Sequence, residues 1–447
     1  MGHSTTTYIT SVTTTPHTMN GSDMTHISGG IRATSQNAVF VTGADNYLTV
    51  DGYVRVLDSS GIINSGQLFL TVGQDGQIFQ QANGFNLAVH FAATEGLASS
   101  LQNFGTISGA YAVAVTGDDV GNTLQNFGMI SSTSLYGGVA IYIESDNNAI
   151  ENFGTITGLG RAIDIRSTVT GNTIFNQGDI TGSIGIEFQP SSTTAVENFG
   201  TISGSSGTAI NILGSGGKIR NFDTVNGDIN AGADGNNMVV VNYGTVNGDI
   251  LLGNGTDKYF GRDDGRVAGA VRGGSGADTL DGGNGADYLY GDQGNDLIRA
   301  GDGNDVLNGG SGVDTIKGNA GRDAIDGGDN SDFLFGGADA DTIKGGNGND
   351  RIMGGRGDDV MTGNAGADIF IFQRYTDDDV ITDFQNNVDK LDLSAYNVNS
   401  RNELFSKGGI FSDGSGSIID LTVVGGDGII MVEDMSVGDW SASDFIF

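Results

Sequence analysis

The chain has 447 residues, of which 54 are acidic and 20 basic, giving a formal net charge of −34, and it contains no cysteine. This length allows two or three domains. The charge disfavours nucleic acid or an anionic membrane as a partner, and the lack of cysteine excludes disulfides and thiolate metal sites. No apolar run reaches the ~18 residues of a membrane span, and the N-terminus lacks the apolar core of a secretory signal.

Residues 1–40 are rich in threonine and serine, as in Thr13-Thr14-Thr15, and contain three of the four histidines. This composition has two interpretations. The segment is a loosely ordered N-terminal arm, or it is a strand that pairs with a neighbouring molecule or caps the fold that follows.

Residues 41–260 carry a repeat whose clearest copy is Asn-Phe-Gly-Thr-Ile-Ser-Gly, starting at Asn103. Units rich in Val, Ile, Thr and Gly, 21–26 residues apart, are typical of the rungs of a parallel β-helix. A β-sandwich explains this register less well. We expect each asparagine to hydrogen-bond its counterpart one rung away and each following ring to stack likewise. Residues 41–260 resemble the passenger β-helices of bacterial surface proteins. Further copies start at Asn126, Asn152, Asn176, Asn198, Asn221 and Asn242.

Residues 261–371 form the next predicted domain, and a degenerate unit at 253–259 precedes it without a visible linker. Within it, residues 273–371 are eleven uninterrupted units of nine residues. Position eight is apolar in every unit and predicts one inward side chain per turn. Position six is aspartate in every unit, namely Asp278, Asp287, Asp296, Asp305, Asp314, Asp323, Asp332, Asp341, Asp350, Asp359 and Asp368.

We expect each unit to be a glycine-rich hexapeptide followed by a three-residue strand, and the period predicts a solenoid in which two units complete one coil. Unit n then lies beside unit n+2 at the strand spacing of ~4.8 Å, and the aspartates form two columns. Carboxylates at that spacing repel by roughly 3–4 kcal/mol per pair at an effective dielectric of about 20. We therefore expect the segment to be unfolded without metal. A hard divalent cation held between turns by carboxylate and carbonyl oxygens supplies the missing stability, and oxygen ligands favour calcium.

The pattern G-G-x-G-x-D-x-apolar resembles the repeat-in-toxin (RTX) family, whose calcium-binding parallel β-roll occurs in bacterial proteins exported by type I secretion. The resemblance implies ions bound by the position-six aspartates and loop carbonyls of units n and n+2. Eleven units contain nine such pairs, so about nine Ca²⁺ ions are expected. Asn330 and Asp339 replace the glycine at position four, and both tolerate left-handed backbone. Ala300 replaces the glycine at position one.

Residues 372–447 follow the repeats. Residues 379–384 (Asp-Val-Ile-Thr-Asp-Phe) and 389–394 (Asp-Lys-Leu-Asp-Leu-Ser) resemble the segment that closes RTX β-rolls, and residues 439–447 resemble a C-terminal type I secretion signal. The expected fold is all-β: a right-handed parallel β-helix that continues into an RTX parallel β-roll, with a small C-terminal β cap.

Catalytic motifs are absent from the sequence: it contains neither His-Glu-x-x-His nor Gly-x-Ser-x-Gly, which excludes the usual zinc-protease site and nucleophile elbow. A β-helix polysaccharide lyase or epimerase would need acids beside a basic residue. The local candidates are Glu144, Glu151, Arg161, Asp164 and Arg166, for which solvated rim charges are the favoured interpretation.

We therefore predict a non-enzymatic, calcium-dependent extracellular protein of bacterial type: a surface-layer, adhesin, matrix or filament subunit, secreted unfolded and folded by calcium. Head-to-tail self-assembly into homo-oligomers, and contact with a cell surface or polysaccharide, fit this prediction. The alternative is a polysaccharide lyase or epimerase with an RTX module.

Overall fold

The structure is a computed structural model, and it describes residues 6–447 except 10–16, 21–23, 28–29, 34–38, 43–45, 57–60, 65–66, 81–86, 93–97, 118–120, 135–136, 167–168, 190–193, 215, 233–234, 236, 375–376, 413 and 415. About half of the predicted N-terminal arm (1–40) therefore lies outside the described residues. The chain divides into two compact units, residues 1–251 and 252–447, and each is described by itself.

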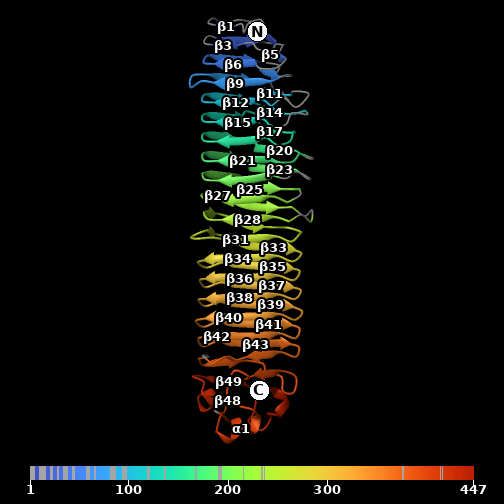
Figure 1. Ribbon diagram of the computed structural model, residues 1–447, viewed down its shortest axis with the longest axis vertical. Helices are drawn as coiled ribbons and strands as arrows, with labels where there is room; N and C mark the ends of the chain where they lie inside the picture. Colours follow the sequence, from blue (N-terminus) through green and yellow to red (C-terminus); the bar gives the residue numbers. More distant parts are fainter. Residues whose placement is uncertain are drawn as a thin grey trace. The chain divides into compact units, whose positions relative to one another are not determined.

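The first unit is a parallel β-solenoid with three strands to a rung (Figure 1). Each strand pairs in register with its counterpart on the next rung, as Asn103 does with Asn126. The first column consists of β1 (Thr6–Ile9), β3 (Met24–Ile27), β6 (Asn46–Val50), β9 (Leu68–Val72), β12 (Ser100–Asn103), β15 (Thr123–Asn126), β18 (Ala149–Asn152), β21 (Asn172–Asn176), β24 (Thr194–Asn198), β26 (Lys218–Asn221) and β28 (Val239–Asn242).

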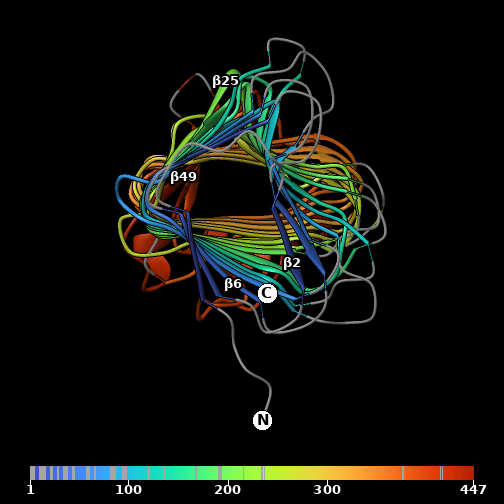
Figure 2. The same ribbon diagram turned by 90° about the horizontal axis from the view of Figure 1, so that it is seen from above.

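The other two columns complete each rung, and seen along the stack their strands lie over one another (Figure 2). The second contains β4 (Gly30–Ala33), β7 (Tyr53–Val56), β10 (Gln77–Gln80), β13 (Thr106–Gly109), β16 (Met129–Ser132), β19 (Thr155–Thr157), β22 (Asp179–Gly182), β25 (Thr201–Ile212), β27 (Thr224–Ala231) and β29 (Thr245–Val246). The third contains β2 (His17–Asn20), β5 (Val39–Thr42), β8 (Ile62–Asn64), β11 (Leu87–Phe91), β14 (Tyr111–Val115), β17 (Val139–Ile143), β20 (Arg161–Ile165), β23 (Ile184–Phe188), the later parts of β25 and β27, and β30 (Ile250–Leu251).

Columns of identical residues hold neighbouring rungs together, as the sequence predicted. The amide nitrogen of Asn103 donates to the amide oxygen of Asn126 at 2.7 Å, and the same bond recurs at 2.8 Å on each rung as far as Asn242. The asparagines are fully buried or nearly so. The rings that follow them stack at 4.3–4.9 Å centroid to centroid. The exception is Asn176, which is followed by Gln177; there the tilted ring of Phe175, in β21, lies between its neighbours at 6.0 and 5.5 Å. Isoleucines such as Ile107 fill the core, each stabilising the fold by roughly 1.5–3 kcal/mol.

The second unit begins with two columns of parallel strands, and register partners in the repeat are 18 residues apart, as Leu280 and Ile298 are. The strands are six residues long rather than the predicted three, because the first residues of each glycine-rich turn also pair with the neighbouring coil, as Gly283 does with Gly301. All position-eight side chains are buried.

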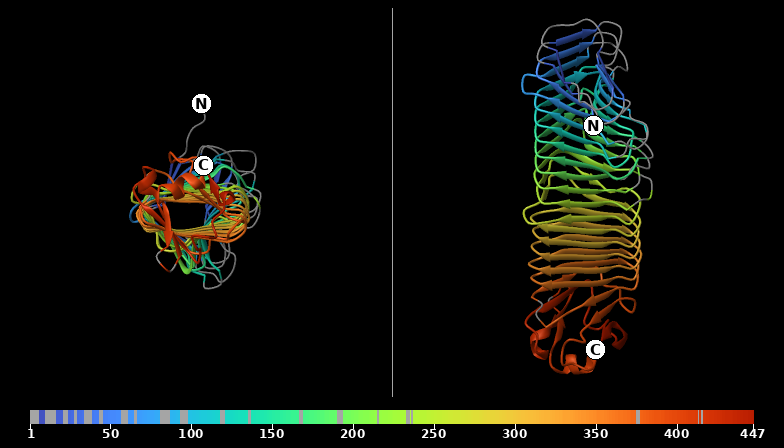
Figure 3. Two further views of the ribbon diagram at one scale, coloured as in Figure 1. Left: turned by 90° about the horizontal axis from the view of Figure 1, so that it is seen from below. Right: turned by 45° about the horizontal axis from the view of Figure 1, so that its top comes forward.

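One column contains β31 (Lys258–Gly261), β34 (Thr279–Asn284), β36 (Leu297–Asp302), β38 (Thr315–Ala320), β40 (Phe333–Ala338), β42 (Arg351–Arg356), β44 (Ile369–Ile371), β46 (Lys390–Asp392) and β50 (Phe445–Ile446). The other, which follows β32 (Arg266–Val267), contains β33 (Val271–Ser275), β35 (Tyr288–Gln293), β37 (Val306–Ser311), β39 (Ala324–Asp329), β41 (Thr342–Asn347), β43 (Val360–Ala365), β45 (Asp379–Ile381) and β49 (Ile429–Glu433). The right-hand view of Figure 3 shows these strands running parallel through the repeats.

A small cap follows the repeats. Strands β47 (Ile410–Ser412), β48 (Gly416–Asp420) and β49 form an antiparallel sheet that joins the column through β45. The cap also contains helices α1 (Arg401–Ser406), η1 (Leu421–Val424), which contacts β49, and η2 (Ala442–Asp444), which contacts β46. The segment predicted as a secretion signal forms η2 and β50, and Trp440 packs its ring against Phe384 and Phe445. Among the described residues, no helix is long and apolar enough to cross a membrane.

The asparagine column makes a stability prediction. Replacing Asn152 with alanine leaves the amide donor of Asn126 and the amide oxygen of Asn176 buried without these partners. We expect the first unit to lose about 1–3 kcal/mol of unfolding free energy, measured by urea denaturation of the full chain in calcium. Gln125→Ala is the matched control, because Gln125 forms a comparable but less buried amide chain with Gln102 and Glu151. Equal losses in the two variants would contradict a special role for the buried column.

Candidate calcium-binding site

The position-six aspartates lie in two columns along the repeat, as predicted, and are at most 5% exposed. In all of them except Asp287, one carboxylate oxygen accepts a hydrogen bond from the backbone N–H of an aspartate one coil earlier. For example, Asp278 N–H donates to Asp296 Oδ1 at 2.7 Å. Nine such bonds of 2.7–2.9 Å connect successive aspartates from Asp278 to Asp368. Unit n therefore meets unit n+2 through this residue.

The second carboxylate oxygen of these aspartates is buried and has no hydrogen-bond partner within the described chain. A Cβ placed on Gly291 would lie 2.3 Å from Asp296 Oδ2 and 2.6 Å from the carbonyl oxygen of Gly309, one coil further on. Oxygens from two coils thus face the same small space without a donor. The arrangement repeats for Gly273, Gly282, Gly309, Gly318, Gly327, Gly336 and Gly345, whereas at Ala300 a methyl group already stands in this position.

Left-handed backbone shapes each turn and explains which residues may replace glycine. Positions two and four have positive φ in every unit, and Asn330 and Asp339 adopt it at 78° and 74°. Asparagine and aspartate visit this region more readily than other residues with a Cβ, so the prediction for these two positions is confirmed. Asp292, Asn319 and Asn364 do the same at position two, with φ of 72°, 79° and 66°.

Burial raises the pKa of every position-six aspartate, because a charged carboxylate loses hydration inside the turn. In most of them, neighbouring carboxylates raise the pKa further. In many, the backbone N–H that donates to Oδ1 stabilises the charged form and partly offsets this rise. The pKa rises to about 6 for Asp323 and Asp359, to about 7 for Asp287, Asp296 and Asp368, and to about 8 for Asp332 and Asp341.

The chemistry of this site fits a hard cation. Anionic and carbonyl oxygens, without nitrogen or sulfur donors, are the ligand set that calcium prefers. No group of three or more His, Cys, Asp or Glu side chains able to hold a metal occurs in the described part of the chain. An ion here would therefore take a large share of its ligands from backbone carbonyls. Bound calcium supplies positive charge between the turns, and the chain supplies aligned oxygens.

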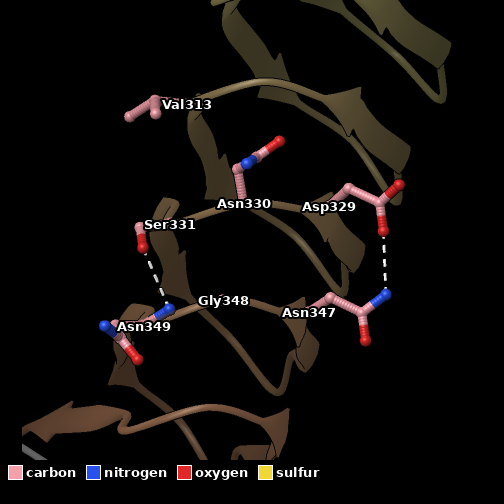
Figure 4. A pocket seen from close by; sticks show the side chains of 7 residues that line it. All are labelled: Val313, Asp329, Asn330, Ser331, Asn347, Gly348 and Asn349. Carbon is pink, nitrogen blue, oxygen red and sulfur yellow. Dashed lines mark hydrogen bonds between the residues drawn. The ribbon is translucent and has the colours of Figure 1, made fainter.

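The outer surface of the turns carries a separate, shallow polar depression (Figure 4). Within it, the amide of Asn347 donates to Asp329 Oδ1 at 2.8 Å, and Asn349 N–H donates to Ser331 Oγ at 2.9 Å. These bonds tie neighbouring coils together on the solvent side. The depression is lined by Val313, Asp329, Asn330, Ser331, Asn347, Gly348 and Asn349.

The candidate catalytic residues of the β-helix are brought together only in part. Arg166 Nη2 lies 3.0 Å from Asp164 Oδ2, and Arg161 Nε lies 2.6 Å from Glu187 Oε1. Glu187 was missed by the sequence prediction, because only the strand register places it beside Asp164. Burial raises the pKa of Asp164 to about 6. Glu144 joins the edge of the group through the hydroxyl of Tyr142 at 3.2 Å, whereas Glu151 lies in β18, in another strand column.

Three further aspartates that the sequence prediction did not assign as ligands extend the columns, although one of them, Asp257, lies in the degenerate unit at 253–259. Asp257 N–H donates to Asp278 Oδ1 at 2.7 Å, Asp359 N–H to Asp379 Oδ1 at 3.0 Å, and Asp368 N–H to Asp389 Oδ1 at 2.9 Å. Their spacings are 20 or 21 residues rather than 18. An aspartate two residues before an apolar residue, as in Asp379-Val380-Ile381, was the available signal.

This geometry defines a parallel β-roll with calcium-type aspartate columns, and comparison with known proteins agrees. The family described as the RTX calcium-binding nonapeptide repeat (4 copies) matches residues 272–307, 299–334, 308–343 and 344–372. Residues 272–372 are therefore RTX calcium-binding repeats. A search of curated proteins found no match. Among solved structures, the extracellular lipase LipA from Serratia marcescens is similar at 16% identity, with a TM-score of 0.19 over 44% of this chain and 45% of the lipase. This chain thus spans less than half of that lipase, and the likeness supports no inference about activity.

The raised pKa values predict opposite pH dependences with and without calcium. The unfolded aspartates titrate near ~3.9, so between about pH 4 and pH 8 the folded, calcium-free roll binds more protons than the unfolded chain. Its unfolding free energy therefore falls as pH rises through this window. In chelator the roll is expected to be unfolded near neutral pH, and protonation of the aspartates should restore part of its hydrogen-exchange protection. We therefore expect protection of residues 279–365, corrected for intrinsic exchange rates, to be greater at pH 5 than at pH 8 in chelator. In excess calcium protons compete with the metal, and the order should reverse. Protection that rises with pH in chelator would contradict this assignment.

Proposed function

We propose that the chain is a calcium-dependent extracellular structural or adhesive protein: a surface-layer, adhesin, matrix or filament subunit. In this proposal the eleven position-six aspartates hold about nine Ca²⁺ ions, one between each unit n and unit n+2. The buried, unpartnered second oxygens of these aspartates carry the proposal. A carboxylate that is buried without a counter-charge destabilises the folded state strongly, so the roll requires cations.

A structural role is supported by how the first unit uses its side chains. Its buried asparagines and stacked rings bond or pack against their own counterparts one rung away, and the hydroxyl of Ser131 likewise donates to that of Ser108. Such columns stabilise a solenoid and leave few groups free to act on a substrate. The proposed organisation is an N-terminal segment (1–40) whose strands β1–β4 join the columns of the first unit, a β-helix (41–260), a calcium-binding β-roll (261–371) and a β cap with a secretion signal (372–447).

The proposed need for calcium also suggests how the protein is exported from the cell. A calcium-free roll with repelling carboxylates stays unfolded and suits export as an extended chain, as is typical of RTX proteins. Outside the cell, sites of extracellular type fill at about 10⁻⁴–10⁻³ M calcium. Folding would then follow export, on a bacterial surface or in the surrounding medium, with other copies of the chain or surface polysaccharide as partners.

Calcium removal tests the proposal. In millimolar calcium we expect strong hydrogen-exchange protection in β34–β43 and ordered assemblies in electron micrographs. Chelator should remove both, because the carboxylates then repel. Strands β12–β28 are the internal control and should keep their protection, because their columns use neutral amides and rings. Only monomers in the micrographs, together with no calcium bound to the chain or to cells carrying it, would defeat the proposal.

A second candidate function, polysaccharide lyase or epimerase, has one observation in its favour: Arg161, Asp164 and Arg166 meet beside Glu187. Their charges are mutually paired, so we favour a structural role for the group. Incubation with uronate polymers, followed by ultraviolet absorbance of unsaturated products and by NMR of epimerised residues, should show no turnover. Turnover by the wild type that Asp164→Asn abolishes and Glu151→Gln retains would establish the enzyme instead.

A further inference from the structure

One face of the β-roll carries apolar and basic side chains, although the chain as a whole is strongly acidic. This roll face consists of the outward residues of β36, β38, β40, β42 and β44, at positions seven and nine of alternate units, and of the equivalent residues of β46. Because successive strand residues point to opposite sides, they face away from the buried position-eight side chains. Phe333 and Phe335 lie in register with Arg351 and Met353 one coil further on, and Phe333 is 39% exposed. Ile369 follows Arg351 on the next coil.

The basic side chains of the roll face have no acidic partner in the described part of the chain. Elsewhere in the second unit basic groups lie beside carboxylates, as Arg262 does beside Asp281 at 2.9 Å. Lys317, Arg351 and Lys390 form no such salt bridge with any described residue. Cations left unpaired on a chain of net charge −34 favour a partner that brings carboxylates to this face.

The apolar side chains favour a protein partner over a polysaccharide. A sugar ring stacks on an open aromatic face and needs hydrogen-bonding groups around it. Here the ammonium of Lys317 already lies over the ring of Phe335, 5.4 Å from its centroid, and Ile369 and Ile371 offer no hydrogen bond. Aromatic rings, methionine and arginine around an apolar centre are instead the composition of protein–protein interfaces.

The order of side chains along the roll face is complementary to the same face turned end for end. Counted from Met353, Phe335 lies one coil before and Lys317 two coils before. Ile371 lies one coil after Met353, and Asp392 lies two coils after it. Two copies can pack face to face and antiparallel, related by a two-fold axis along the strand direction at Met353. Lys317 of each copy then lies opposite Asp392 of the other, and Phe335 lies opposite Ile371.

Position seven follows the same rule. The same axis places Phe333 opposite Ile369 and Thr315 opposite Lys390, because these residues also lie equal numbers of coils from the centre. The two Arg351 side chains lie nearest the axis, where their length lets the guanidinium groups reach solvent at the rim. A contact in which each surface meets its own copy is the usual form of a two-fold interface.

We propose that a second copy of this chain docks on the roll face, so that two rolls pair antiparallel about a two-fold axis at Met353. Lys317–Asp392 pairs then lie on either side of an apolar centre. The inference rests on the proposed function and deepens it by naming the contact through which copies of the roll assemble. Pairing depends on calcium because the face exists only when the strands are folded. A two-fold contact closes on itself, so it gives pairs of rolls rather than growing chains.

Single cysteines test the register of this contact, because the chain has none of its own. Facing sheets pack about 10 Å apart, a gap that a short bismaleimide spans. In millimolar calcium, full-length Met353→Cys should cross-link to a covalent dimer. Lys317→Cys and Asp392→Cys should cross-link when mixed but not separately, since like positions on the two copies lie four coils, roughly 19 Å, apart. Tyr288→Cys, on the other strand column and 49% exposed, is the control and should stay monomeric.

The inference is overturned if Met353→Cys yields no more dimer than Tyr288→Cys, or if the mixed pair yields no more than its members alone. Assemblies that persist in micrographs while these cysteines stay uncross-linked leave the proposed function standing and remove only this contact. A wild-type chain that binds no calcium defeats the proposed function itself, so the two failures are distinguishable.

Sedimentation equilibrium in calcium gives a second test that needs no cross-linker. Phe333→Thr should fold, because threonine occupies position seven at Thr279, Thr315 and Thr342, but it removes an apolar contact from both halves of the pair. We expect dimer dissociation to rise about tenfold or more, whereas Tyr288→Thr should match the wild type. A monomeric wild type overturns the inference, as does one that binds a uronate polymer instead through the same residues.

Discussion

Repulsion between buried carboxylates stacked at the strand spacing is the constraint on which the second unit depends. Ten of the eleven position-six aspartates bond one carboxylate oxygen to the backbone of the preceding coil, and the second oxygen of all eleven is buried without a hydrogen-bond partner among the described residues. The strand pairing, the apolar core and the turns are formed by the chain alone, but the negative charges of the aspartates are not balanced by positive charges of the chain. The nine divalent ions of the proposed function would bring the formal charge from −34 to −16. Under that proposal, much of the acidity of this chain serves to bind metal.

The first unit meets the same geometric demand with neutral groups. A residue that recurs at one position of a rung always faces its own copy, so a stable column needs a side chain compatible with itself. The amide of asparagine both donates and accepts, and aromatic rings stack. Columns of Asn152 and Phe153 counterparts therefore hold the rungs without any ion. Both units stack identical side chains on one another. The first unit stacks neutral amides and rings, which attract one another, whereas the second stacks carboxylates, which need calcium between them.

How far the sequence predicts the structure depends on how regular the spacing is. The nine-residue period fixed the pairing of Asp278 with Asp296, the inward position of Leu280 and the left-handed backbone of Asn330. The recurring asparagine likewise predicted its hydrogen-bonded column. Prediction failed where chain length varies between equivalent points. Asp379 and Asp389 fall 20 and 21 residues after their partners, and Glu187 meets Arg161 only because of the rung register. The sequence predicted strands that are too short in the nine-residue repeat, because the glycine-rich turns also pair between coils and this backbone pairing leaves no pattern of side chains in the sequence.

The asparagine column bears on how such a chain can change in length. Each amide donates in one direction and accepts from the other, so every rung presents the same face to the next. Duplication of a whole rung would place a new asparagine between two old ones and restore both bonds. Deletion of a rung would rejoin the column in the same way. Genes encoding this architecture can therefore gain or lose rungs while the remaining contacts stay intact, provided that the change spans one complete turn.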